Sequence, residues 1–453
     1  MACKQNLMKC HHTIKMVVMV VCWLTLLDAT YAIVNISATP AVADGRVYFP
    51  SWNGYLYAVD AFTGRLIWQQ NLGALTGLNG TGVVVNVTVS RSTPTIAGNL
   101  LIVGIYGPTL VIAVDRSNGR LVWSTQLDPR PRVLITMSGT VHLGAFYAGV
   151  SSLQEGLPAA QCCNFRGSIV KLNLRTGVIL WRTYMLPDNG GRLGGYSGAA
   201  VWGSSPAIDI SRRHVYVATG NLYTAPPGVT KCQERQNNQR GKPTHPDQCI
   251  GPDINFNSIL ALDLDSGRIV WSRQLGGYDV FYFASLVPNN PDCPPGPNLD
   301  ADFGEAPMLL TIHPNRTRRD VVVAVQKSRF AWALARDNGT IVWLIHLLDF
   351  VVGGSKGGGI WGAATDGRRV YTNIANGDRE NFTLAPSSQT TTAGARVALD
   401  ADSGEILWTT ANPSNDTAQA PVTVANGVVF AGSAASNGPI YAMKALWKNF
   451  VVV

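Results

Sequence analysis

Apolar and polar positions alternate along the chain in six segments that each end in tryptophan. Each segment joins one apolar strand to a second strand through a polar turn, and a glycine stands four residues before the tryptophan. The pairs are Gly64 with Trp68, Gly119 with Trp123, Gly177 with Trp181, Gly267 with Trp271, Gly339 with Trp343 and Gly404 with Trp408. A glycine after Asn, Ser or Thr supplies the positive φ of a tight turn. The pattern therefore predicts a β-hairpin in every repeat.

A further pair of strands is predicted before most of these hairpins, in segments 39–54, 92–107, 204–221 and 420–438. Four strands per repeating unit are typical of the blades of a β-propeller. We expect each tryptophan to lie in the seam between neighbouring blades, where its ring is buried and its N–H bonds a carbonyl. The expected fold class is all-β.

Two segments break the repeat. Residues 223–254 are rich in Pro, Asn, Gln and charge, and Cys232 and Cys249 stand near their ends. We predict a long surface loop closed by a disulfide. At Ile440 a seventh repeat begins, but it lacks the polar turn with glycine before the chain ends.

The first 32 residues have the layout of a secretory signal peptide. Three lysines precede an apolar run at 16–27, and small residues end at Ala32. The run is shorter than the roughly 20 residues that span a bilayer, so we expect cleavage, a mature propeller domain of residues 33–453 and no membrane span. An uncleaved anchor is the alternative.

Other sequence features agree with export. Seven N-x-S/T triplets predict glycans on surface loops: Asn35, Asn79, Asn86, Asn315, Asn338, Asn381 and Asn415. Five cysteines remain after the predicted leader, and an odd number leaves at least one without an intramolecular partner. We expect a secreted protein of the extracellular space or cell wall.

The composition excludes some classes of function. Of 453 residues, 46% are hydrophobic and 14% charged, which supplies a large core and argues against disorder. The net charge of +8 is spread along the chain without an aromatic and basic stripe. We therefore expect no nucleic-acid partner, and at most attraction to an acidic exterior.

The repeat resembles the pyrroloquinoline quinone (PQQ) repeat family, and within it the polyvinyl-alcohol-dehydrogenase-like proteins, including their plant branch. The most specific stretches are GAAVWGSSPAIDISRRHVYVATGNLY, CCNFRGSIVKLNLRTG, QLGGYDVFYFAS, DADFGEAPML, QKSRFAWALARDNG and GGGIWGAATDGRRVY. The resemblance implies an eight-bladed propeller that carries PQQ and usually Ca²⁺ on its axis and oxidises alcohols. With six clear repeats and one fragment, we expect incomplete blades at both chain ends.

The resemblance also implies a base and a metal site. Asp279 matches the aspartate base that takes the alcohol proton and also contacts the metal. Asn221, in a T-G-N motif, matches a calcium ligand. The family's glutamate ligand aligns with Cys162, so Glu155 is the substitute candidate. A turn-capping Asp279, an Asn221 in a left-handed turn and a solvated Glu155 are the structural alternatives.

Further residues would bind PQQ. Trp202 matches the tryptophan on which the quinone ring stacks, and Trp361 repeats its W-G context in a later blade. Lys327 matches the cation that bonds the quinone oxygen and stabilises charge on reduction, and Arg166 is a candidate partner for a PQQ carboxylate. The structural alternatives are core packing for Trp202 and surface exposure for Lys327.

Cys162 and Cys163 are adjacent in the sequence, and two interpretations stay open: the two residues form a disulfide with each other, or they do not. Neighbouring Cα atoms lie about 3.8 Å apart, below the usual disulfide spacing of about 4.4–6.8 Å, so a bond between them requires an unusual geometry. Methanol dehydrogenases of the resembled family place a vicinal disulfide against PQQ, although in an earlier blade. A bonded pair would contact the cofactor. Relatives of the resembled family have a cysteine where this chain has Ser285, so the resemblance implies that Cys293 is the odd thiol.

Two hypotheses on function follow. The first is a secreted quinoprotein oxidoreductase that oxidises a small or polymeric alcohol with PQQ and Ca²⁺ and passes electrons to an external acceptor. The second is a non-catalytic propeller scaffold that binds a protein or glycan. Asp279, Asn221, Trp202 and Lys327 favour the first, and the displaced glutamate and shortened ring favour the second.

Overall fold

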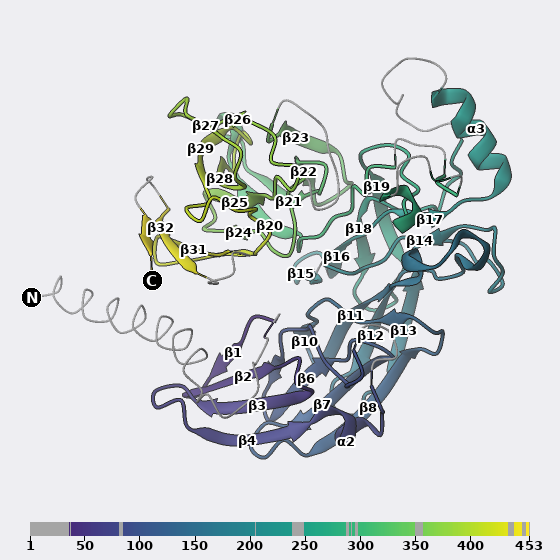
Figure 1. The fold of residues 1–453 in the computed structure, drawn as a ribbon, viewed down its shortest axis with the longest axis vertical. Helices are drawn as coiled ribbons and strands as arrows, with labels where there is room; N and C mark the ends of the chain where they lie inside the picture. Colours follow the sequence, from purple (N-terminus) through teal and green to yellow (C-terminus); the bar gives the residue numbers. More distant parts are fainter. Residues whose placement is uncertain are drawn as a thin grey trace, which may run out of the picture. The chain divides into compact units, whose positions relative to one another are not determined.

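The computed structural model describes residues 36, 38–80, 85–203, 205–237, 249–286, 290, 292–294, 298–348, 357–433, 439–445 and 450–452. The predicted signal peptide 1–32 and Asn35 lie outside these residues. Antiparallel strands dominate the described chain (Figure 1), which confirms the all-β prediction. The chain forms two compact units, residues 1–150 with 171–180 and residues 151–170 with 181–453.

The first unit contains two antiparallel sheets in which each strand pairs with the next one along the chain. Their strands are β1 (Ala41–Ala43), β2 (Arg46–Pro50), β3 (Tyr55–Asp60), β4 (Leu66–Asn71), β5 (Thr95–Ala97), β6 (Leu100–Gly104), β7 (Thr109–Asp115) and β8 (Leu121–Asp128). A short helix, α2 (Leu72–Thr76), follows β4. A third sheet contributes residues to both units, with β9 (Val133–Leu134), β10 (Thr140–His142), β11 (Ala145–Ser152), β12 (Ser168–Asn173) and β13 (Ile179–Tyr184).

The second unit contains four sheets of four strands, in the orders β15-β16-β18-β19, β20 to β23, β24-β25-β28-β29 and β30 to β33. The strands of the first two are β15 (Ala207–Asp209), β16 (His214–Ala218), β18 (Ser258–Asp263), β19 (Ile269–Gln274), β20 (Met308–Ile312), β21 (Arg319–Val325), β22 (Phe330–Ala335) and β23 (Ile341–His346). Those of the last two are β24 (Ala364–Thr365), β25 (Arg369–Ile374), β28 (Ala395–Asp400), β29 (Ile406–Ala411), β30 (Val422–Ala425), β31 (Val428–Gly432), β32 (Ile440–Lys444) and β33 (Phe450–Val452). Two small sheets are inserted: β14 (Ser197–Gly198) with β17 (Leu222–Thr224), and β26 (Phe382–Thr383) with β27 (Thr390–Thr391).

The predicted hairpin turns are present and have a common chemistry. In the turn after β3, the Asp60 carboxylate accepts hydrogen bonds from the backbone N–H groups of Phe62 and Thr63, at 3.1 and 2.8 Å. Gly64 then adopts a φ of +70°, which a residue with a Cβ rarely adopts. The side chain of the aspartate thus shapes the turn and the glycine closes it.

The six motif tryptophans link successive repeats, as predicted. Each indole N–H donates to a backbone carbonyl of the following repeat. The bonds run from Trp68 to Arg116 (3.0 Å), Trp123 to Leu174 (3.0 Å), Trp181 to Leu264 (3.3 Å), Trp271 to Arg336 (2.9 Å), Trp343 to Ala401 (3.0 Å) and Trp408 to Ala445 (3.2 Å). The tryptophans are therefore structural residues of the seams between sheets.

The motif glycines have a second role that the sequence did not reveal. A Cβ added at Gly339 would lie 2.6 Å from Cε3 of Trp271, the tryptophan of the preceding repeat. Gly119, Gly177, Gly267 and Gly404 face the preceding tryptophan in the same way. These five glycines are thus required both by their turns and by close packing against the ring.

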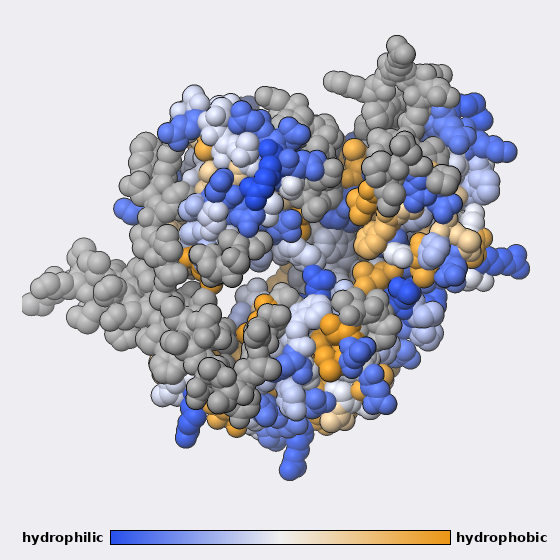
Figure 2. Space-filling view, in the orientation of Figure 1, coloured by the Kyte–Doolittle hydropathy of each residue, from blue (hydrophilic) through white to orange (hydrophobic). Residues whose placement is uncertain are grey.

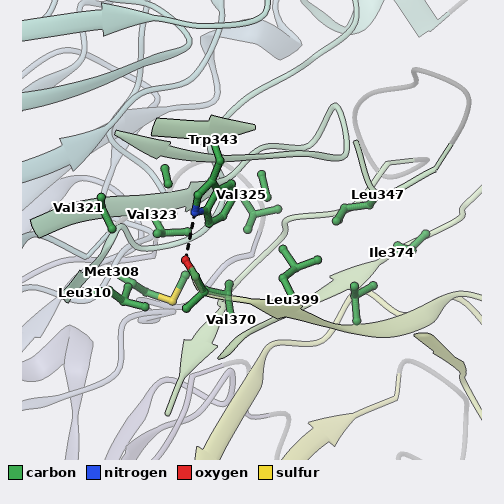
Figure 3. Close-up of a cluster of buried hydrophobic side chains, with 14 of the residues drawn as sticks. Met308, Leu310, Val321, Val323, Val325, Trp343, Leu347, Val370, Ile374 and Leu399 are labelled. Atoms are coloured by element: carbon green, nitrogen blue, oxygen red, sulfur yellow. Dashed lines mark hydrogen bonds between the residues drawn. The ribbon is translucent and has the colours of Figure 1, made fainter. Parts of the chain in front are cut away.

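Apolar side chains fill the space between neighbouring sheets. Figure 3 shows the cluster between the β20 to β23 sheet and the sheet of β24, β25, β28 and β29, with Trp343 at its edge. Val323, Val325 and Val397 are completely buried there. Burial of this apolar surface stabilises the stack of sheets.

The outer strands expose part of their apolar residues. Val122 on β8, Val270 on β19 and Leu407 on β29 stand next to a seam tryptophan and are 49%, 42% and 39% exposed. On the face drawn in Figure 2, apolar side chains reach the surface over β18 and β19 among hydrophilic neighbours. On the outer strands, some apolar side chains therefore pack in the seam between sheets, and others face the solvent.

Three expectations need correction. Seven sheets of four or more strands are present among the described residues, and eight are not confirmed. The expected incomplete end blades are wrong for these sheets: β1 to β4 form a four-stranded sheet, and β33 pairs with β32 although the sequence between them lacks the polar turn motif with glycine. The predicted loop 223–254 contains an 11-residue helix, α3 (Pro227–Asn237), in which Pro227 suits the first helical position and Lys231, Gln233, Glu234 and Arg235 have good helix propensity.

The predicted disulfide between Cys232 and Cys249 is confirmed, the open question on Cys162 and Cys163 is answered by a bond between them, and glycosylation of the sequons stays a prediction. Disulfides join Cys232 with Cys249 and Cys162 with Cys163, and Cys293 is free and exposed. The six described sequon asparagines, Asn79, Asn86, Asn315, Asn338, Asn381 and Asn415, are exposed. Within the described part of the chain, no helix is long and apolar enough to cross a membrane.

The double requirement on the motif glycines predicts a graded loss of stability. Gly339→Ala should lower the thermal midpoint more than Gly427→Ala, because both positions have φ near +70° but only Gly339 faces a ring. The backbone strain costs roughly 1–2 kcal/mol at either site, and overpacking adds about 1–3 kcal/mol at Gly339. Scanning calorimetry of both variants measures the difference, and equal losses would contradict the packing role.

Candidate functional site

Four backbone segments of the second unit converge beside the ends of neighbouring strands. Residues 219–222 follow β16, 279–281 follow β19, 300–304 precede β20 and Lys327 follows β21. The backbone N–H of Leu222 donates to the Asp279 carbonyl at 3.1 Å, and that of Lys327 donates to the Asp302 carbonyl at 2.9 Å. Backbone hydrogen bonds therefore hold charged side chains from two adjacent sheets together.

Asp279 is buried and heavily bonded. It is 1% exposed, and its carboxylate accepts hydrogen bonds from Asn257 Nδ2 (2.9 Å), Ala301 N (2.7 Å) and Asp300 N (3.1 Å). Burial raises the pKa of Asp279 above its usual value, although the bonds from Ala301 and Asn257 oppose this. The side chain is a fixed carboxylate in a low-dielectric setting, as a general base requires.

Lys327 carries its charge into the same cluster. Its ammonium lies 2.8 Å from the Asp300 carboxylate and 2.9 Å from that of Asp302, and 4.8 Å from the centre of the Trp202 ring. Burial alone lowers the pKa of Lys327, but the two aspartates outweigh it and raise that pKa above its usual value. The lysine is therefore protonated at neutral pH, and the surface alternative is wrong.

Asn221 lies next to these groups. Its backbone N–H donates to Asp302 Oδ1 at 2.5 Å, and its amide Nδ2 donates to the carbonyls of Leu222 (2.7 Å) and Phe281 (2.9 Å). Because Nδ2 is used in this way, the amide oxygen is the atom left for a ligand.

Glu155 belongs to the cluster rather than to the solvent. It lies on the short 3-10 helix η1 (Gln154–Gly156) and is half-buried. Burial, together with the charge of Asp302, raises the pKa of Glu155 to about 7, while Lys327 opposes the shift. From the sequence, Glu155 was only a candidate metal ligand that does not align with the family's glutamate. In the folded chain it lies close enough to Lys327 for their charges to interact.

The vicinal disulfide Cys162–Cys163 lies close to Gln154, the residue that precedes Glu155. Sγ of Cys163 lies 3.4 Å from the Gln154 carbonyl oxygen. The Gln154 side-chain oxygen accepts from the backbone N–H groups of Asn164 and Phe165, at 3.0 and 2.9 Å. The Cys162–Cys163 loop is thus tied to η1, so that the disulfide adjoins the cluster although its register differs from the family's.

Trp202 and Trp361 meet edge to face, with ring centres 5.1 Å apart. The contact is close because Gly304 lies under Trp202: a Cβ there would be 3.0 Å from the ring. The backbone N–H of Trp361 donates to the Gly304 carbonyl at 2.9 Å. The two tryptophans predicted to line one cavity are therefore adjacent.

Arg166 is engaged elsewhere. Its guanidinium bonds Asp188 at 2.9 Å and lies 4.0 Å from the centre of the Tyr184 ring. No contact with Lys327 or Asp279 accompanies these among the described residues. Its Nε is buried and has no hydrogen-bond partner in the described chain, so one donor remains for a ligand.

Several site residues escaped the sequence reasoning. Asp300 and Asp302 clamp Lys327, and Asn257 holds Asp279, with its own Oδ1 buried and without a partner in the described chain. The D-A-D spacing before F-G was the available signal for the two aspartates. Asn257 carries no local signal, because only the fold places it beside Asp279.

Sequence comparison assigns the family. The PQQ-repeat family model, described as outer membrane protein assembly factor BamB, matches residues 21–273, which is more than half of the chain. The chain belongs to this family. The predicted resemblance is confirmed.

Curated relatives of this PQQ-repeat protein include two polyvinylalcohol dehydrogenases. The one from Pseudomonas sp. is 28% identical over 349 residues, 74% of this chain and 48% of the relative. The one from Sphingopyxis sp. (strain 113P3) is 27% identical over 418 residues, 86% of this chain and 57% of the relative. The chain thus spans about half the length of the curated relatives it matches.

Solved structures agree with the sheet arrangement. The quinohemoprotein alcohol dehydrogenase from Comamonas testosteroni superposes with a TM-score of 0.63 at 20% identity, over 91% of this chain and 66% of that chain. At this identity the likeness concerns the fold. The seven sheets are the blades of a β-propeller.

The residues present suit a planar anionic quinone better than a metal alone. Trp202 offers an aromatic surface beside the Lys327 ammonium, and Arg166 has a spare buried donor. Among the described residues, no group of three or more His, Cys, Asp or Glu side chains is placed to hold a metal ion. A calcium ion, which takes about 6–8 oxygens, would need oxygens from a bound quinone as well as from Asn221.

Glu305 is a further buried acid next to this site. It is completely buried, and its carboxylate lies 3.1 Å from the Thr372 hydroxyl, which donates to it. Burial raises the pKa of Glu305 to about 8, although Thr372 and Arg396 oppose this. Glu305 follows Gly304, the residue that packs against Trp202, so a buried acid directly adjoins this part of the site in the chain.

The raised pKa of Glu305 predicts a pH-dependent contribution to stability. The folded state keeps this proton up to about pH 8, whereas an unfolded glutamate loses it near pH 4.3. The group therefore lowers the free energy of unfolding by up to about 1.4 kcal/mol per pH unit across that window. Glu305→Gln lacks this loss, so its thermal midpoint relative to wild type should rise from pH 5 to pH 8. Glu405→Gln, at an exposed turn position, is the control, and a constant difference for Glu305→Gln would contradict the prediction.

Proposed function

We propose that this PQQ-repeat protein is a quinoprotein-type oxidoreductase that oxidises alcohol groups with PQQ. The observation that carries the proposal is the buried Asp279 carboxylate held by three donors close to the Lys327 and Trp202 pair. The names of the relatives, polyvinylalcohol dehydrogenase and quinohemoprotein alcohol dehydrogenase, support it. A propeller whose centre had only a structural role would not need a cluster of buried charged side chains, because burying charge costs free energy.

The proposed reaction removes two electrons and two protons from the alcohol. Asp279 accepts the proton of the alcohol hydroxyl, and the carbon loses its hydrogen as hydride. A bound PQQ, stacked on Trp202 and next to Lys327, would supply the two-electron oxidant that accepts this hydride. The raised pKa of Asp279 makes it a stronger base than a solvated aspartate.

The remaining side chains would bind and orient the quinone. Trp202 offers the stacking surface with Trp361 at its edge, and the Lys327 ammonium stabilises negative charge on the quinone oxygens. Arg166 is proposed to bind a quinone carboxylate through its spare Nε–H. Cys162 and Cys163, tied to η1, would contact the ring from the side of Glu155.

Calcium is proposed to enter this site only together with the quinone. Its ligands would be the Asn221 amide oxygen, one Asp279 oxygen and Glu155. Asp279 Oδ1 accepts a single backbone bond, which leaves a lone pair for a cation. Calcium binding would also favour the ionised form of Glu155.

Asp279→Asn should lower kcat by at least about 10²-fold, the low end of the effect of a general base. The purified chain is loaded with PQQ and Ca²⁺, and reduction of a redox dye with simple alcohols is followed. Quinone binding, read from fluorescence quenching, should persist because the amide preserves the shape of the side chain. Asp265→Asn, on the exposed β18–β19 turn, is the matched control. Unchanged turnover in Asp279→Asn would reject the base, and no alcohol-dependent dye reduction by the folded wild type would reject the proposed function.

Calcium should stabilise the protein only in the presence of PQQ. A saturating ligand at 100 times its Kd adds about 2.7 kcal/mol, which a thermal shift detects readily. Glu155→Gln should weaken the calcium-dependent shift without removing PQQ binding, whereas Glu234→Gln, on the surface of α3, should leave it intact. An equal shift by Ca²⁺ without PQQ, or no calcium effect with PQQ, would contradict the proposed ligand set.

We also propose that the protein acts outside the cell, in the extracellular space or cell wall. Exposed sequon asparagines and the Cys232–Cys249 disulfide support an oxidising export route. The substrate would be a small or polymeric alcohol. The electron acceptor is proposed to be external.

A non-catalytic scaffold is the second candidate. The description of the matched family model, an assembly factor, supports it, and so do exposed apolar residues such as Leu180 on the outer strand β13 and Val178 just before it. A folded sample that binds no PQQ would favour this candidate over the oxidoreductase.

A further inference from the structure

Paired arginines recur at the same place in three consecutive sheets. Each pair lies where the second strand of its sheet begins, just before β16 or at the start of β21 and β25. The pairs are Arg212 with Arg213, Arg318 with Arg319 and Arg368 with Arg369. They are not part of the motif that ends in tryptophan, so the repeat itself does not explain them.

The paired arginines lie at the opposite end of their strands from the candidate functional site. Strand β21 begins at Arg319, and Lys327 follows its last residue. In the same way, β16 begins after Arg213, and residues 219–222 of the site follow it. A strand of seven residues extends about 23 Å. A ligand at the arginines would therefore bind away from the groups around Asp279.

The three turns that carry the pairs are connected to one another. The Arg212 guanidinium lies 3.1 Å from a carboxylate oxygen at the start of β21. The β28–β29 turn joins the second pair to the third: Asp402 accepts a bond of 2.7 Å from the backbone N–H of His313, and the backbone N–H of Ala401 donates to the Arg368 carbonyl at 2.9 Å. The pairs thus form one arginine row along the ends of three sheets.

A cavity of about 340 Å³ opens where the first two turns meet. Its lining residues are Arg212, Arg318, Arg319, Asp320, Ala335 and Asp337. The Arg212 guanidinium is fixed there, because it lies 3.1 Å from the Asp320 carboxylate and 2.7 Å from that of Asp337. Both aspartates of the cavity therefore have an arginine partner already.

The remaining arginines at this cavity have positive charge to offer a ligand. Arg318 is 72% exposed, and its ion contact with Asp320 is long, at 3.6 Å. Arg316 and Arg319 are also exposed, and neither forms an ion pair with another described residue. A guanidinium group is a planar fork that binds a carboxylate or sulfate through two hydrogen bonds. The rim of the cavity is thus suited to an anionic group.

The arrangement of the arginine row favours a polymer over a single small anion. A chain with an anionic group on successive units can contact successive pairs, and linked contacts raise the overall affinity. None of the described residues that line the cavity is aromatic, so the stacking surface that single-stranded nucleic acids use is missing there. Acidic polysaccharides are polymers of this kind outside the cell, where we propose that the protein acts.

We propose that the arginine row binds an acidic polysaccharide, with one carboxylate or sulfate group held in the cavity by Arg318 and Arg319 beside the fixed Arg212. The net charge of +8 favours approach to such a polymer. Binding is independent of the proposed oxidation chemistry, because it uses the other ends of the strands. It would hold the protein on an acidic extracellular polymer and leave the residues around Asp279 uncovered.

The test is titration calorimetry of the chain without PQQ. An oligogalacturonate presents carboxylates and a heparin oligosaccharide presents sulfates, and at least one should bind with an affinity that falls as salt is added. The triple variant Arg316→Gln, Arg318→Gln and Arg319→Gln should raise that Kd about 10-fold, the scale of three exposed ion pairs. N-glycans are removed enzymatically beforehand, because the sequon asparagines Asn315 and Asn338 are close in sequence to the cavity residues.

A second triple variant, Arg175→Gln, Arg192→Gln and Arg235→Gln, is the matched control. It removes the same charge from exposed positions outside the arginine row, and it should keep the wild-type Kd. Arg318→Gln alone should raise the Kd about 2-fold, and it decides the matter if the first triple variant has a lowered thermal midpoint.

Four results would overturn the proposal. They are no binding of either oligosaccharide by the wild type, an equal loss of affinity in both triple variants, equal binding of neutral dextran, and tighter binding of duplex DNA than of both oligosaccharides. Because PQQ and alcohol are absent from these measurements, a failure of the proposed oxidation does not affect their outcome.

Discussion

The hydrogen bond from each motif tryptophan to a carbonyl of the next repeat is the interaction on which the rest of the structure depends. It joins one four-stranded sheet to the following one, and the motif glycine allows the indole ring to approach the neighbouring turn. The site depends on one such seam in particular. Asp279 and Asn221 lie in segments that follow strands of the β15-β16-β18-β19 sheet, whereas Lys327 and Asp302 lie next to strands of the β20 to β23 sheet, and Trp271 joins these two sheets through Arg336. The spacing of the charged groups therefore follows from seam packing.

The site contains charged side chains whose burial is energetically unfavourable, and the packed sheets hold them in place. Several carboxylates are buried against one ammonium, and burial raises the pKa values of Glu155, Asp279 and Glu305. Backbone N–H groups and Asn257 compensate part of the cost for Asp279. Several buried charges that each cost folding free energy within one small region are typical of functional sites rather than of structural cores.

Particular residues show where sequence reasoning worked. The six tryptophan bonds, the turns with glycine, the Cys232–Cys249 disulfide and the adjacency of Trp202 and Trp361 follow from local pattern or from family resemblance, and the structure agrees with each. The sequence left the bond between Cys162 and Cys163 open, and the structure contains it. The helix α3 within the predicted loop and the complete last sheet were missed. In α3 the turn-like composition hid a helix, and β33 pairs with β32 although no local turn signal announces it.

The sequence by itself determined the repeated hairpin, its turn chemistry and the seam tryptophan, because each is specified by residues within about a dozen positions of one another. Only the tertiary structure decided which charged groups meet. Glu155, Asp279, Asp302 and Lys327 are separated by up to 172 positions in the chain, and no periodicity relates them. Their proximity depends on how one sheet is set against the next, and so does the raised pKa of Glu155. Long-range packing creates a site from residues that carry no mutual signal in sequence.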